Sequence, residues 1–149
     1  MFRSVPQSIT NQSIKRGQTS EKLLVNWRHF HNTTSVVTLF NTGVTTSYPY
    51  AYGRIPVPFN CFVESVIISA NKFSSEGTPT GTSSTMSIYK GEGTLVKEKT
   101  VTYTPSEGMT LTFDFGETAP INTGEKIALR YQSNGLWKYM NSTIVIVQR

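Results

Sequence analysis

The stretch Met109–Phe115 alternates strictly between apolar and polar side chains. Its odd positions are Met, Leu or Phe, and its even positions are Thr or Asp. Successive side chains of a β-strand point to opposite faces, so this pattern is typical of a strand with one face in a core and the other in water. The stretch therefore predicts a half-buried antiparallel sheet, as in a β-sandwich.

Similar short segments recur from residue 35 onwards, separated by turns rich in Gly, Pro, Ser and Thr. About eight strands at spacings of roughly 8–12 residues are typical of a sandwich or jelly roll. The chain is thus expected to be all-β: an antiparallel sandwich or jelly roll preceded by an extended N-terminal arm. We expect strands over 35–40, 61–70, 85–90, 94–103, 109–115, 125–132, 136–140 and 143–147, and an edge strand or irregular crossing over the proline-marked stretch 46–53.

Residues 61–70 are the segment expected to lie deepest in the core. The single cysteine, Cys61, begins this apolar run, which predicts a buried, inert thiol and leaves no disulfide within the chain. Alternation assigns Phe62, Val66 and Ile68 to one face of the strand and Val63 and Ile67 to the other.

Groups that perform catalysis are few in this sequence. Charged residues make up only 15% of the 149 residues, against a typical quarter. The two histidines, His29 and His31, precede the predicted sandwich, and the sole aspartate, Asp114, lies on the polar face of a strand. No Ser/His/Asp or Cys/His set can be assembled inside the domain. We therefore expect a non-enzymatic protein without a cofactor.

Positive charge is concentrated at the N-terminus. Residues 1–30 contain five basic residues and one acidic residue, which accounts for +4 of the net charge of +5. We therefore divide the chain into an attachment arm, 1–34, and a sandwich domain, 35–149. The arm lacks a basic run, so an anchoring role is favoured, a merely solvated tail is the alternative, and nucleic acid is the least favoured partner. The residues expected to make the attachment are Arg3, Lys15, Arg16, Lys22, Leu23, Leu24, Trp27 and Arg28.

The end of the arm, residues 20–31, is open to two interpretations. Ser20 could cap a short helix, but an extended strand fits nearly as well. On an extended chain His29 and His31 would share a face, and a threefold axis would then gather six imidazoles into a metal site. Surface or interface histidines without a metal are the favoured interpretation.

Aromatic residues form a second candidate surface. Core or subunit-interface packing is favoured for them, and a platform that stacks on host sugars is the alternative. They are Tyr48, Tyr50, Tyr52, Trp137 and Tyr139.

Residues 1–7 lack the apolar stretch of a secretory signal, and no run of about 18 apolar residues occurs. We therefore expect no membrane association.

Two stretches resemble small β-sandwich domains of tailed-bacteriophage virion proteins. One is Ala51-Tyr-Gly-Arg-Ile-Pro-Val-Pro-Phe-Asn60 with the apolar strand that follows it. The other is Phe113-Asp-Phe-Gly116 followed by Ile121-Asn-Thr-Gly-Glu-Lys-Ile-Ala-Leu129. The resemblance covers roughly residues 50–132, and lectin-like jelly rolls share such turns.

This resemblance implies a non-enzymatic structural protein on the surface of a virion. Members of the family occur as capsid decoration or head-fibre proteins and as tail or neck fibres and adhesins, usually as oligomers and often as trimers. Capsid decoration is preferred here because the chain is short and has no fibrous repeat. The implied partners are other virion proteins, contacted through the arm, and further copies of the chain. A tail or neck fibre, or an adhesin that binds a host surface glycan, is the alternative.

Overall fold

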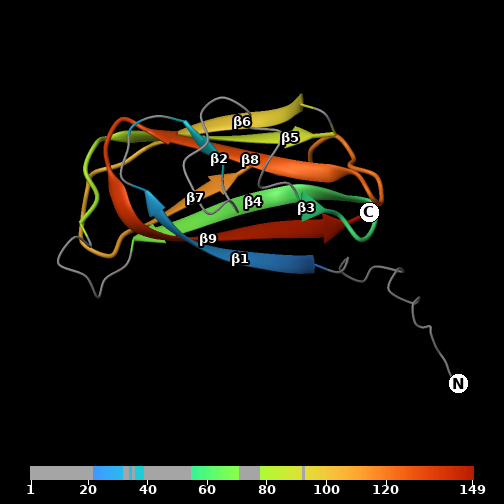
Figure 1. Cartoon of the computed structure of the whole chain (residues 1–149), viewed down its shortest axis with the longest axis horizontal. Coiled ribbons are helices and arrows are strands. Elements are labelled where there is room, and N and C mark those ends of the chain that lie inside the picture. The colour runs from blue at the N-terminus through green and yellow to red at the C-terminus, as the bar shows by residue number, and fades with distance from the viewer. Residues whose placement is uncertain (1–21, 32–33, 35, 39–54, 71–77, 92) are drawn as a thin grey trace, which may run out of the picture.

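The computed structural model describes residues 22–31, 34, 36–38, 55–70, 78–91 and 93–149. These residues form nine β-strands and no helix. The strands build two antiparallel sheets that pack into a sandwich (Figure 1). The prediction of an all-β sandwich is confirmed. Among the described residues there is no helix that could cross a membrane.

The first sheet joins strands from opposite ends of the described chain. Its order is β1-β9-β4-β7, so the first strand pairs with the last. Its members are β1 (Lys22–His31), β9 (Trp137–Gln148), β4 (Cys61–Ala70) and β7 (Thr110–Asp114).

The second sheet has the order β2-β8-β5-β6, and β3 also pairs with β8. Since β5 occupies one side of β8, the short strands β2 and β3 share the other side, at opposite ends of β8. The members are β2 (Val37–Thr38), β3 (Ile55–Pro56), β5 (Ser83–Lys90), β6 (Thr94–Thr102) and β8 (Lys126–Ser133).

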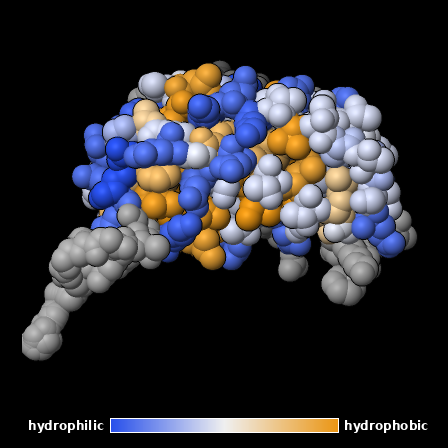
Figure 2. Space-filling model, turned by 180° about the vertical axis from the view of Figure 1, so that it is seen from behind, coloured by the Kyte–Doolittle hydropathy of each residue, from blue (hydrophilic) through white to orange (hydrophobic). Residues whose placement is uncertain are grey.

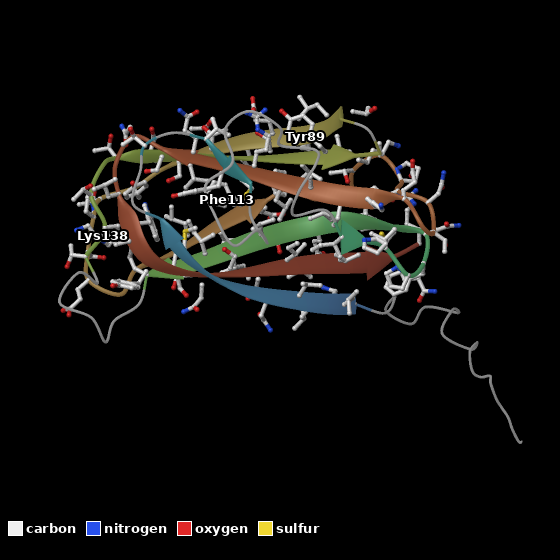
Figure 3. All side chains as sticks on the ribbon, viewed as in Figure 1. Tyr89, Phe113 and Lys138 are labelled. Atoms are coloured by element: carbon white, nitrogen blue, oxygen red, sulfur yellow. The ribbon has the colours of Figure 1, made fainter. Side chains whose placement is uncertain are left out.

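Strand β7 confirms the alternation in residues 109–115. Leu111, Phe113 and Phe115 are buried, whereas the residues between them are exposed. Phe113 lies between the two sheets (Figure 3) and meets Tyr131 of the opposite sheet edge to face, with ring centroids 6.4 Å apart. This contact joins β7 to β8 through the core, as the period of two requires.

Strand β4 is found where it was predicted, but the assignment of its first residues to faces is wrong. Val63 is fully buried and Phe62 is only half-buried. A β-bulge is the cause: opposite β9, Val63 pairs with Ile146 and Ser65 with Val145, so Glu64 is an extra residue. An extra residue reverses the alternation. Cys61 is fully buried, as predicted, and burial raises the pKa of its thiol.

Two predicted strand boundaries are also wrong. Residues 136–140 and 143–147 are not separate strands but parts of one strand, β9, which runs on through Asn141 and Ser142. A polar pair resembles a turn, yet Ser142 is buried at an inward-facing position of the alternation. Of the predicted strand 35–40, residues 36–38 are described, and β2 covers Val37–Thr38 of them. The stretch 46–53 lies outside the described residues.

Strand β1 decides between the two interpretations of residues 20–31. Residues 22–31 are extended and pair with β9 along their whole length. Leu23 and Val25 pack against the core, whereas Leu24 is 59% exposed. The sandwich therefore begins inside the range 1–34 assigned to the arm. Attachment through that range stays a prediction.

Candidate functional site

The residues expected to form the attachment arm differ in how much of them the structure describes: side chains for 22–24, backbone alone for 27 and 28, and nothing for the rest. Lys22 is in β1 and its Nζ lies 3.0 Å from Glu64 Oε1, an exposed ion pair. Leu23 and Leu24 follow it on opposite faces of the strand. Trp27 and Arg28 belong to β1 by their backbone pairing with β9, and Arg3, Lys15 and Arg16 lie outside the described residues.

The candidate metal ligands, His29 and His31, both lie in β1, opposite Met140 and Trp137 of β9. The described residues include no group of three or more His, Cys, Asp or Glu side chains that could hold a metal ion. A site at a threefold axis would need further copies of the chain, so it stays a prediction.

The aromatic set is not a continuous surface in the described part of the chain. Trp137 is only 1% exposed and belongs to the core, so its ring cannot stack on a sugar. Tyr139, two residues on, is 37% exposed. The residues Tyr48, Tyr50 and Tyr52 lie outside the described residues. Seen from behind, the surface carries several separate hydrophobic areas among hydrophilic ones (Figure 2).

A polar cavity of about 170 Å³ lies on the outer face of the sheet that contains β5. We name it the β5 hollow. The backbone of β5 forms its floor, β6 and β8 lie on either side, and Val36, next to β2, completes the wall. Besides Val36, its lining consists of Thr85, Ser87, Tyr89, Glu98, Arg130, Tyr131 and Gln132.

Strand register explains why the hollow forms. Ser87 pairs with Arg130 of β8 on one side and with Glu98 of β6 on the other. Directly paired residues on one face lie about 4.5–5.5 Å apart. A short side chain thus stands between two long ones, and the surface is hollowed above it. Ser87 is only 5% exposed because its neighbours stand higher.

Hydrogen bonds fix the walls of the β5 hollow. Ser87 Oγ donates to Glu98 Oε2 at 2.7 Å. Arg130 Nη1 donates to the hydroxyl of Tyr89 at 3.3 Å, and its guanidinium carbon lies 5.6 Å from the centre of the Tyr89 ring. Arg130 Nε is buried and has no hydrogen-bond partner within the described part of the chain. The hollow therefore places a cation and an anion beside the aromatic ring of Tyr89.

A shallower depression of about 430 Å³ adjoins the hollow and shares Thr85 and Gln132 with it. Asn134 lines its far side. The Oδ1 atom of Asn134 accepts hydrogen bonds from the backbone N–H groups of Thr82 and Ser83, at 2.8 and 3.1 Å. Together, the two cavities form a continuous polar track along β5 and β8.

Sequence reasoning did not find the β5 hollow. Its central residues come from three strands, and only the register brings them together. The one available signal is Arg130, a charge within the otherwise apolar run 127–131. Tyr89 lies on the sheet that contains β5, away from the core position of Phe113 (Figure 3).

The fold and site define an antiparallel β-sandwich with a polar hollow on the outer face of one sheet. No protein-family model matches the chain, and a search of the curated proteins finds no match.

Proposed function

We propose that this chain is a non-enzymatic structural protein of a bacteriophage virion, of the capsid decoration or head-fibre type, with a jelly-roll body. The observation that supports it is the nesting of strand pairs. β5 pairs with β6, β4 with β7, β2 and β3 with β8, and β1 with β9. A jelly roll is such a nested set of antiparallel pairs wound over two sheets, and viral capsid proteins use it.

In this proposal the sandwich is displayed on the particle and the N-terminal segment attaches it to other virion proteins. Removal of the first 21 residues leaves every described strand intact, because β1 begins at Lys22. The segment 1–21 can therefore be tested separately from the fold. Copies of the chain associate with one another, and a trimer is the form tested first, by mass measurement in solution. A stable monomer would contradict it.

The deciding experiment measures how much of the chain is recovered in purified phage particles, by immunoblot. Deletion of residues 1–21 should abolish recovery while the isolated sandwich still folds. A charge-removing variant, Arg3→Gln with Lys15→Gln and Arg16→Gln, should reduce recovery of the chain in the particles.

The matched control removes three lysines from the sandwich, by Lys97→Gln, Lys99→Gln and Lys126→Gln. Equal loss in the two triple variants would contradict attachment by the arm. Absence of the unaltered chain from particles would overturn the virion proposal.

A second candidate is a tail or neck fibre, or an adhesin, that binds a host surface glycan. The β5 hollow is the observation that favours it, since a displayed body with a polar cavity can take a small hydrophilic ligand. Jelly rolls also occur as lectins.

A further inference from the structure

We propose that the β5 hollow binds a neutral sugar ring of a glycan, with Glu98 and Arg130 as its two polar walls. This inference rests on the second candidate function, glycan binding, and assigns it a site and a ligand class. It does not depend on Trp137, which is buried.

The charges of the hollow select against ionic ligands. Glu98 and Arg130 flank the same serine from opposite sides, so a ligand above Ser87 meets both. A carboxylate or phosphate attracted by Arg130 would lie beside Glu98, and an ammonium attracted by Glu98 would lie beside Arg130. A neutral ligand avoids both repulsions.

Hydroxyl groups match the unused hydrogen-bonding capacity of these walls. Each hydroxyl both donates and accepts, so neighbouring hydroxyls of a sugar can donate to Glu98 and accept from Arg130. Ser87 donates to Glu98 Oε2, and no hydrogen bond from the described residues reaches Glu98 Oε1. Among the described residues, the Arg130 guanidinium donates one hydrogen bond, to the Tyr89 hydroxyl, out of the five that it can donate.

Tyr89 and the size of the cavity fit the same ligand. The aromatic ring offers an apolar wall beside polar groups, which suits the C–H faces of a sugar ring. A cavity of about 170 Å³ has the volume of about six water molecules in the liquid, which suits a single ring. The adjoining depression, about 430 Å³, leaves space for a further sugar of the same chain.

The test uses the full-length protein on a glycan array, followed by saturation-transfer NMR. The free probes are glucose, galactose, mannose and N-acetylglucosamine, with glucuronic acid and N-acetylneuraminic acid as acidic comparisons. We expect neutral glycans to bind. Glu98→Gln keeps the shape of the side chain and lies on an edge strand, so it should fold normally and still lose about tenfold or more in affinity, since a hydrogen bond to a charged group is removed. Arg130→Lys should do the same from the opposite wall.

The matched control is Glu107→Gln, the same change at an exposed turn residue; it should bind as the unaltered protein does. Neutral-glycan binding that survives both wall variants would overturn the site but leave glycan binding as a function. Binding of acidic glycans alone would overturn the ligand class. If no glycan binds, both the site and the glycan-binding function are overturned. Recovery of the chain in particles is a separate measurement and would not be affected by that result.

Discussion

The indole Nε1 of Trp137 donates a hydrogen bond of 3.1 Å to the hydroxyl of Tyr103, and the two rings meet edge to face with centroids 5.5 Å apart. The same hydroxyl donates to the carbonyl oxygen of Thr80 at 2.7 Å and lies 2.9 Å from Ser133 Oγ. One phenol therefore ties the end of β6 to β8, β9 and the segment before β5.

Tyr103→Phe should lower the free energy of unfolding by about 1–3 kcal/mol, because the buried Trp137 and Ser133 lose a hydrogen-bond partner that water cannot replace. Urea unfolding measures the change. Thr112→Val is the control, since it also removes a hydroxyl without changing shape, but from an exposed position on β7. Its effect should stay within about 0.5 kcal/mol. Equal losses in the two variants would show that the Tyr103 hydroxyl has no special role.

The buried hydroxyl of Tyr131 should make the stability of the fold depend on pH. Burial raises the pKa of its hydroxyl, and hydrogen bonds with Ser84 and Ser133 offset this only in part. A raised pKa in the folded state means that the folded protein keeps a proton that the unfolded chain loses. Stability should therefore be constant below the unfolded pKa of about 10 and fall as the pH rises above it.

Urea unfolding between pH 8 and pH 11 measures this fall. Cys61, also buried with a raised pKa, contributes with the same sign, so the informative quantity is the difference between Tyr131→Phe and the unaltered protein. The variant should lose less stability over the alkaline range. Equal losses of stability with rising pH in the two proteins would contradict the assignment of this pH dependence to Tyr131.

The loop between β8 and β9 leaves no space for a side chain at Gly135. A Cβ atom there would collide with the carbonyl oxygen of Thr80, and this backbone atom cannot move aside cheaply. Gly135→Ala should therefore destabilise the fold by several times the effect of Gly116→Ala. Gly116 has a φ of +65°, and, its chain neighbours aside, no atom of the described residues lies within 4 Å of the added carbon. That variant should therefore incur only backbone strain, about 1–2 kcal/mol. Thermal unfolding compares the two, and similar melting temperatures would contradict the clash.

The alternation of apolar and polar residues predicted most of those features of the fold that could be inferred from the sequence. It works where one residue opposes one residue, as in β7, and fails at Glu64, where the bulge reverses the faces of Phe62 and Val63. Such an insertion depends on the partner strand, which local pattern does not contain. Buried serines mislead in the same way: Ser84 occupies the core because Tyr131 of another strand is its hydrogen-bond partner.

The local sequence pattern could not predict the β5 hollow, for a related reason. Ser87, Glu98 and Arg130 are ordinary strand residues until the sheet order places them in one row. That order depends on long-range pairing between β5 and β8, which begin more than forty residues apart. Of the aromatic residues, for which core or interface packing was the favoured interpretation, Trp137 lies in the core.

The pairing of β1 with β9 makes a sharp prediction about two adjacent leucines. Leu23 packs against the core from β1, whereas Leu24 points to solvent and is 59% exposed. Leu23→Ala should lower the free energy of unfolding by about 1–3 kcal/mol, below the full range for a completely buried leucine. Leu24→Ala makes the same chemical change on the other face and should stay within about 0.5 kcal/mol. Urea unfolding of both variants measures the difference. Equal, negligible effects would mean that residues 22–31 do not belong to the sandwich in solution and act as part of a detached arm instead.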